Sequence, residues 1–178
     1  MNTHIDQIVI EEIAEKILKD CDTYDIYEIL EKIGGKLEYN VNFDAMFKKT
    51  GDESFTINIE SAENKDKYHE NMAKFDIAQD IAYAVIGGGY KEYYDDFNKW
   101  QYVPENKWLT IFDFDISIDT INRLAAAILM PKEKYMQTIE KYTTKQNTVN
   151  LEMVARELDL NINQIHLRGK QIGIFDIL

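Results

Sequence analysis

Two segments near the start of the sequence repeat apolar residues every three or four positions, which is the spacing of one face of an α-helix. They cover residues 8–18 and 26–33, with apolar positions at Ile10, Ile13, Ile17, Ile26, Ile29, Leu30 and Ile33. The second segment is followed by Gly34 and Gly35, and glycine is typical of the position just after a helix. We therefore expect two helices, with a strand directly after the second.

Alternation of apolar and polar residues, the period of a half-buried β-strand, appears in three places. Residues 36–41 read KLEYNV, residues 54–60 read SFTINIE, and residues 108–117 read WLTIFDFDIS. The first two segments predict strands, and the third predicts a strand or an extended segment. We expect a small sheet of about three strands.

Helical spacing returns over residues 64–86, which carry a wide apolar face and end at three glycines. A further helix is expected to run to Met130, with Ser117 or Asp119 as its N-cap and Pro131 beyond its end. Residues 132–141 predict another helix.

The last part of the chain predicts two short helices within residues 148–169, joined at DLNIN, with Asn150 and Asn163 as caps. We divide the chain into an α+β domain over residues 1–140 and a helical tail over 141–178. The tail resembles a helix-turn-helix and is expected to pack on the same unit.

Composition limits the classes of function. The chain has 178 residues, a formal net charge of −12 and one cysteine, Cys21. The charge argues against direct binding of nucleic acid or an anionic membrane, and a lone cysteine excludes an intramolecular disulfide. The sequence has no signal peptide and no membrane-spanning run, so we expect a cytoplasmic protein.

The segment KFDIAQDIAYAVIGG, residues 74–88, has the frame of a zinc peptidase helix. Such a helix carries histidines at i and i+4, which puts both imidazoles on one face, and a glutamate that activates the metal-bound water. The segment resembles the R-F-T-L-A-H-E-L-G-H-x-L helix of the ImmA/IrrE family of metallopeptidase-like proteins. Gln79, Asp80 and Tyr83 stand where that family has its first histidine, its glutamate and its second histidine.

A second segment supports this resemblance. INRLAAAILMP, residues 121–131, is similar to the family's A-N-x-F-A-A-x-L-L-M-P. Residues 25–40 resemble the family's opening helix and first strand, and residues 151–174 resemble its helical end. The resemblance covers roughly residues 24–175 and implies a minimal zincin-like α+β fold: a small mixed sheet, a central helix carrying the former motif, and a helical tail.

The departures from the family predict loss of catalysis. Its third ligand is a glutamate just ahead of the second segment, where only Asp119 carries a carboxylate. A glutamine amide and a tyrosine phenol are weak zinc ligands, because tyrosine stays protonated near neutral pH. Asp80 is one methylene shorter than glutamate. We therefore expect no metal, no cofactor and no catalytic residue.

Two interpretations of the former site remain open. Gln79, Asp80 and Tyr83 form a polar stripe hydrogen-bonded in place of a metal, or the vacated cleft binds a peptide without cutting it.

Members of the family are often encoded on phages and other mobile elements beside a repressor that they antagonise or cleave. The resemblance therefore implies a pseudo-peptidase that binds a protein stoichiometrically, either a repressor or a host defence component. An acidic mimic of nucleic acid is the alternative, and a metallopeptidase with unusual ligands is a third hypothesis. Residues 90–108 are the predicted contact, because aromatic residues dominate interface hot spots, unless this loop covers the cleft instead. The candidates are Tyr93, Tyr94, Asp95, Asp96, Phe97, Trp100, Tyr102 and Trp108.

Overall fold

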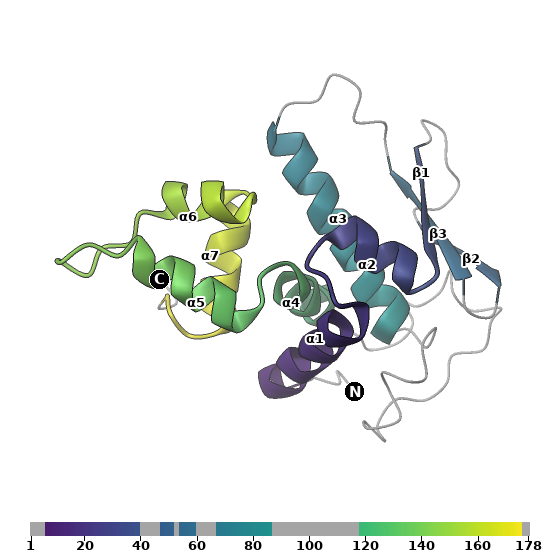
Figure 1. Cartoon of the computed structure of the whole chain (residues 1–178), viewed down its shortest axis with the longest axis horizontal. Helices are drawn as coiled ribbons and strands as arrows, with labels where there is room; N and C mark the ends of the chain where they lie inside the picture. Colours follow the sequence, from purple (N-terminus) through teal and green to yellow (C-terminus); the bar gives the residue numbers. More distant parts are fainter. Residues whose placement is uncertain (1–5, 40–46, 52–53, 60–66, 87–117, 176–178) are drawn as a thin grey trace.

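The chain folds into a set of helices with one small sheet at one end (Figure 1). The computed structural model describes residues 6–39, 47–51, 54–59, 67–86 and 118–175 (Figure 1). Within these residues there are seven α-helices and three β-strands, which confirms the α+β class. The elements are α1 (Gln7–Cys21), α2 (Ile26–Lys32), β1 (Gly35–Tyr39), β2 (Phe47–Gly51), β3 (Ser54–Ile59), α3 (Lys67–Ile86), α4 (Ile118–Leu129), α5 (Lys132–Lys141), α6 (Leu151–Leu158) and α7 (Ile162–Gln171).

The sheet is mixed and has the order β1-β3-β2. β1 pairs with β3 in parallel, with Leu37 opposite Ile57. β2 pairs with β3 in the antiparallel direction. β3 is buried along most of its length, and its Phe55, Ile57 and Ile59 belong to the core. The alternating pattern predicted β1 and β3 but not β2, whose sequence FKKTG has no apolar alternation.

The core lies between the sheet and the tail helices. Figure 1 shows the sheet at one end of the molecule and α5–α7 at the other, with α1–α4 between them. α4 packs against α3 and α1, and α2 packs against α3. Alanines on α4 allow this close approach. The side chains of this central layer with at most 1% exposure include Ile10, Ile17, Ile29, Ile77, Ala78, Ile81, Ala82, Leu124, Ala125, Ala126 and Ile128.

A buried arginine fastens α7 to α1. Arg168 has no exposed side-chain area, and its two terminal nitrogens donate to the two carboxylate oxygens of Glu11 at 2.6 Å each. Its Nε donates to the carbonyl of Met130 at 2.9 Å. Burial of Glu11 raises its pKa, but the hydrogen bonds and charge of Arg168 outweigh burial and hold that pKa below the ordinary value of glutamate.

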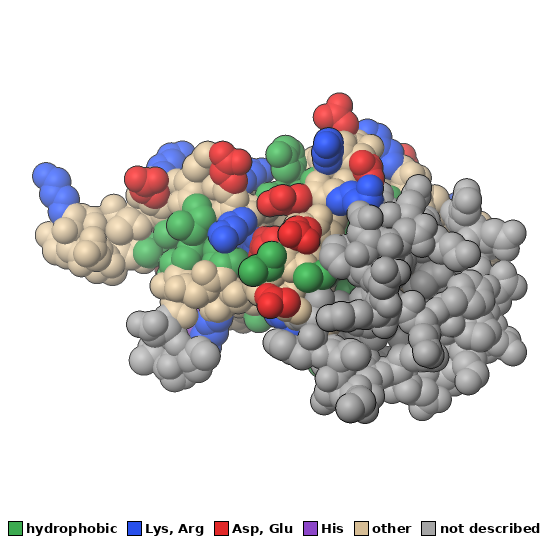
Figure 2. All heavy atoms as spheres, turned by 90° about the horizontal axis from the view of Figure 1, so that it is seen from below, with side chains coloured by type: hydrophobic (Ala, Val, Ile, Leu, Met, Phe, Trp, Pro, Cys, Tyr) green, Lys and Arg blue, Asp and Glu red, His purple; other side chains and the backbone are tan. Residues whose placement is uncertain are grey.

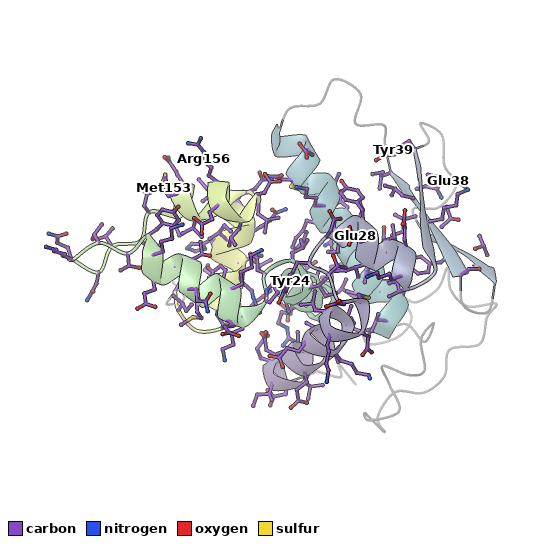
Figure 3. All side chains as sticks on the ribbon, viewed as in Figure 1. Tyr24, Glu28, Glu38, Tyr39, Met153 and Arg156 are labelled. Atoms are coloured by element: carbon purple, nitrogen blue, oxygen red, sulfur yellow. The ribbon has the colours of Figure 1, made fainter. Side chains whose placement is uncertain are left out.

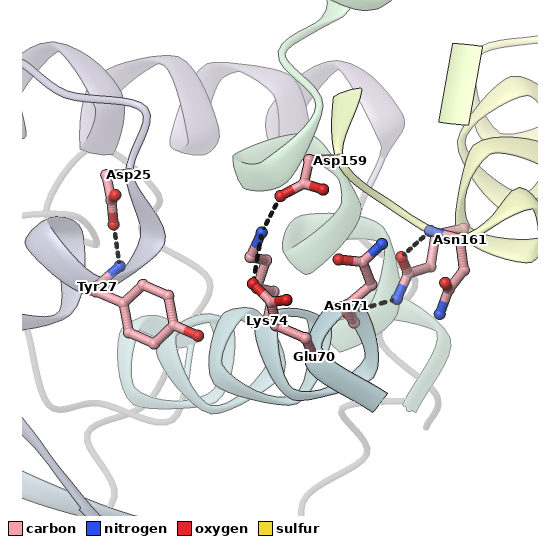
Figure 4. A network of polar contacts seen from close by, with 8 residues as sticks. Asp25, Tyr27, Glu70, Asn71, Lys74, Asp159 and Asn161 are labelled. Atoms are coloured by element: carbon pink, nitrogen blue, oxygen red, sulfur yellow. Dashed lines mark hydrogen bonds and ion pairs between the residues drawn. The ribbon is translucent and has the colours of Figure 1, made fainter. Parts of the chain in front are cut away.

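The turn between α6 and α7 rests on the first half of α3. Figure 4 shows Lys74 of α3 in an ion pair with Asp159 at 2.5 Å. Gln164 donates its side-chain amide to the backbone carbonyl of Asn71 at 3.1 Å and accepts from the backbone N–H of Asn161 at 2.9 Å. α3, which contains the segment that resembles a zinc peptidase helix, therefore contacts the tail directly.

Helix ends follow the predicted capping chemistry at some positions and depart from it at others. Asn150 caps α6 by accepting from the backbone N–H of Met153, as predicted. The cap of α7 is Asn161, so the prediction of Asn163 was wrong, because a capping box with Gln164 begins the helix two residues earlier. Asp119 is not an N-cap, since it lies inside the first turn of α4.

Charge is unevenly distributed along the described chain. Residues 6–39 contain ten acidic and four basic side chains, whereas residues 118–175 contain six acidic and eight basic ones. Figure 2 shows carboxylates gathered in the middle of one face and mixed charges toward the end formed by the tail helices. Among the described helices, none is long and apolar enough to cross a membrane.

Candidate functional site

The three residues that align with the catalytic positions of the resembled family lie on one uninterrupted helix. α3 is helical from Lys67 to Ile86 and contains Gln79, Asp80 and Tyr83. Positions i and i+4 of a helix project from the same face about one turn apart. Gln79 and Tyr83 therefore have the spacing that a pair of metal-binding histidines would need.

Gln79 is hydrogen-bonded across the α3–α4 interface. Its side-chain nitrogen donates to the side-chain oxygen of Asn122 at 2.5 Å. Asn122 belongs to α4, the helix formed by the second motif. The two sequence segments that resemble one family thus meet in space, and their polar residues join each other.

Asp80 is a mostly buried carboxyl group. Its Oδ2 atom has no solvent-exposed area and no hydrogen-bond partner among the described residues. Burial, and secondly the charge of Asp76 one turn earlier, raise the pKa of Asp80 to about 7. A carboxyl group with this pKa is largely protonated below neutral pH, since losing the proton would leave a charge in a poorly solvated place.

Tyr83 and Asp119 do not complete a zinc site. Burial, together with the charge of Asp80, raises the pKa of Tyr83 to about 12, so the phenol keeps its proton at neutral pH. The Asp119 carboxylate is 61% exposed and pairs with Arg123 Nε at 2.9 Å. A neutral amide that donates to Asn122, a neutral phenol and a carboxylate held by arginine do not fit Zn²⁺, which takes thiolate, imidazole or free carboxylate ligands.

No other metal site is apparent in the described ranges. Within residues 6–39, 47–51, 54–59, 67–86 and 118–175, no three His, Cys, Asp or Glu side chains gather where they could hold a metal ion. The predicted contact segment, residues 90–108, lies outside the described residues, as does the predicted extended segment 108–117. Those two predictions stay predictions.

The sequence interpretation missed two partners of the former site. Asn122 had been noted only as a position of family agreement, and its hydrogen bond to Gln79 depends on how α3 and α4 pack. The Asp119–Arg123 pair could have been found, because opposite charges four residues apart on a helix lie side by side. Arg123 also contacts Gln7 of α1 through its terminal nitrogen at 3.5 Å.

No protein-family model matches the chain, and no curated protein matches it.

Proposed function

We propose that this chain is a catalytically inactive, zincin-like protein of the ImmA/IrrE type that acts by stoichiometric binding of another protein. The proposed target is a repressor or a host defence component, and the proposed setting is a phage or other mobile element. The observation that carries the proposal is the Gln79–Asn122 hydrogen bond. In this proposal, Gln79 stands at the position of a metal ligand in the family and serves instead as a structural link between two helices.

Three further observations support an inactive scaffold. Asp80 has a buried carboxyl group beside another acid instead of a glutamate poised over a metal-bound water. Tyr83 is a neutral phenol at neutral pH. Arg123 engages the nearest candidate for a third ligand, Asp119. Restoring catalysis would require changes at all of these positions, because a metal-bound water needs ligands and a base together.

Rebuilding the motif tests the scaffold. The variant Gln79→His/Asp80→Glu/Tyr83→His/Asp119→Glu/Arg123→Ala carries the family's ligand pair and base on α3, and its third carboxylate is no longer paired with Arg123. After incubation with zinc and dialysis, elemental mass spectrometry is expected to give a metal content near zero for the native chain and about one ion per chain for the variant. The same variant without Tyr83→His is the matched control, because it lacks the second histidine.

Each outcome separates the hypotheses. A rebuilt variant that has native circular dichroism but takes up no zinc would contradict the zincin-like scaffold. A native chain that holds zinc and cleaves a peptide library would instead favour the metallopeptidase hypothesis. Stoichiometric action predicts that a partner captured from host cells keeps its full-length mass and forms a complex of fixed ratio in native mass spectrometry.

The nucleic-acid mimic is a second candidate because ten of the 14 charged residues between 6 and 39 are acidic. A mimic acts through many charge pairs, so its affinity falls steeply as salt is added, whereas contacts made by aromatic residues respond weakly. Measuring the affinity of the captured complex from low to high salt distinguishes the two mechanisms.

A further inference from the structure

Tyr24 is an exposed aromatic residue at the corner between α1 and α2. The side chain belongs to the short loop that joins the two helices, and 64% of the residue is accessible to solvent. Figure 3 marks it together with Glu28, which lies on the first turn of α2. An exposed tyrosine on a short loop between two packed helices loses little conformational entropy on binding, which is why such residues serve as interface anchors.

Acidic residues flank this tyrosine on both sides in the sequence. Residues 19–32 contain five acidic side chains and two lysines, a net charge of −3. Local bonds hold several of them in place: Asp25 caps α2 by accepting from the backbone N–H of Tyr27 at 2.8 Å, and Glu28 accepts from the hydroxyl of Thr23 at 2.7 Å. The five acidic residues are all exposed: Asp20, Asp22, Asp25, Glu28 and Glu31.

The Tyr24 ring already makes one cation–π contact within the protein. The ammonium group of Lys134, on α5, lies 5.4 Å from the ring centroid. Cations are attracted to the electron-rich face of an aromatic ring at this distance. Because the residue stays largely exposed, the ring can accept a second cation from outside the molecule, and the nearby carboxylates complement that charge.

We propose that the Tyr24 corner, residues 19–32, is the docking surface for an arginine- or lysine-rich segment of the partner protein. A guanidinium group stacks on the tyrosine ring while neighbouring basic residues pair with Glu28 and Glu31. This assignment rests on the proposed function, that the chain acts by binding a protein. It adds that the segment of the partner that makes the contact is basic.

Fluorescence anisotropy with a labelled peptide of alternating glycine and arginine tests the surface. Tyr24→Ala is expected to weaken binding roughly three- to fivefold, the size of an exposed cation–π contact. Tyr39→Ala is the matched control, since Tyr39 is also an exposed tyrosine, at 56%, but lies on β1. Equal losses in the two variants would overturn the proposal.

Charge reversal gives a second test. Glu28→Lys/Glu31→Lys is expected to weaken binding about tenfold. Glu140→Lys/Glu152→Lys makes the same change in net charge at exposed positions of α5 and α6 and is expected to cost less than about twofold. Equal effects of the two double variants would mean attraction to net charge alone and would overturn the docking surface. The zinc measurements on α3 and α4 do not involve these residues, so that failure would leave the proposed function standing.

Discussion

Arg168 on α7 and Glu11 on α1 form a bidentate ion pair across 157 residues of sequence, with both nitrogen–oxygen distances at 2.6 Å. The arginine is fully buried and the glutamate is 14% exposed. A buried pair of this kind specifies how two helices meet, although its net contribution to stability is small compared with the cost of breaking it.

Removing one partner of this ion pair is therefore expected to destabilise the protein strongly. Arg168→Met should lower the free energy of unfolding by about 3–5 kcal/mol, because Glu11 would keep a poorly solvated charge without a counter-ion. Urea denaturation followed by circular dichroism measures the change. Lys170→Met, at an exposed position of the same helix, should change stability by less than about 0.5 kcal/mol. The double variant Glu11→Leu/Arg168→Met should recover much of the lost stability. If it is as unstable as Arg168→Met alone, the ion-pair explanation is contradicted.

Stability should fall as the pH rises from about 4 to about 7. The pKa of Asp80 is raised from 3.8 to about 7 in the folded state, so over this range the folded chain keeps a proton that the unfolded chain has released. Protonation then favours folding at low pH, and the benefit disappears as the pH passes the folded pKa. The contribution of Asp80 to the free energy of unfolding therefore changes by at most about 4 kcal/mol between low and high pH.

Asp80→Asn should remove this pH dependence and stabilise the protein at pH 8. Thermal melting between pH 4 and pH 8 measures the effect for both proteins. Asp22→Asn is the control, because Asp22 is exposed and its left-handed backbone is one that asparagine also accepts. If the stability of the native chain changes between pH 4 and pH 7 by no more than that of Asp80→Asn, then Asp80 titrates normally.

Two glycines near the end of α7 allow the cost of side-chain crowding to be compared with the cost of backbone strain. A Cβ added to Gly169 would lie 2.1 Å from a ring carbon of Phe175 and 2.9 Å from the Tyr135 hydroxyl. Gly173 has no atom within 4 Å of such a Cβ, but its φ is +73°. Gly169→Ala should destabilise by about 1–3 kcal/mol through overpacking, and Gly173→Ala by about 1 kcal/mol through its left-handed backbone. Denaturation midpoints measure both losses of stability, and a Gly169→Ala variant as stable as the native chain would exclude crowding against Phe175.

The Gln79–Asn122 bond should behave as a structural contact. Gln79→Ala is expected to cost about 1 kcal/mol of stability while leaving partner binding largely intact, and Tyr83→Ala should likewise preserve binding. Coupling between Gln79→Ala and Asn122→Ala in a double-mutant cycle measures the bond itself. Loss of partner binding in Gln79→Ala, with folding retained, would place the function at the α3–α4 interface.

Local patterns predicted most of the secondary structure. Residues 132–141 were predicted as a helix, and α5 has those bounds. Predicted helices over 8–18 and 26–33 agree with α1 and α2 within a few residues. These elements carry their signal in the spacing of their own apolar residues, which is why one sequence suffices. β2 lacked that signal because its position depends on pairing with β3.

The contacts around Gln79, Asp80 and Tyr83 were less predictable because they join distant segments. The i, i+4 relation of Gln79 and Tyr83 follows from the helix alone. The hydrogen bond to Asn122 spans 43 residues, and the pairing of Glu11 with Arg168 spans 157. The raised pKa of Asp80 depends on burial, which a sequence pattern indicates only for a helix face as a whole.

The contacts that hold α1 in place also affect how the chain folds during synthesis. α1 is made early, but the two arginines that reach it, Arg123 and Arg168, follow the residues they contact by 116 and 157 positions. Until α7 has been synthesised, α1 lacks the Glu11–Arg168 ion pair and is held by its packing against α2 and α4 and by the Gln7–Arg123 contact. On a nascent chain that stops before residue 162, the backbone amides of α1 should exchange with solvent faster than those of α3, and equal protection of the two helices would contradict this order.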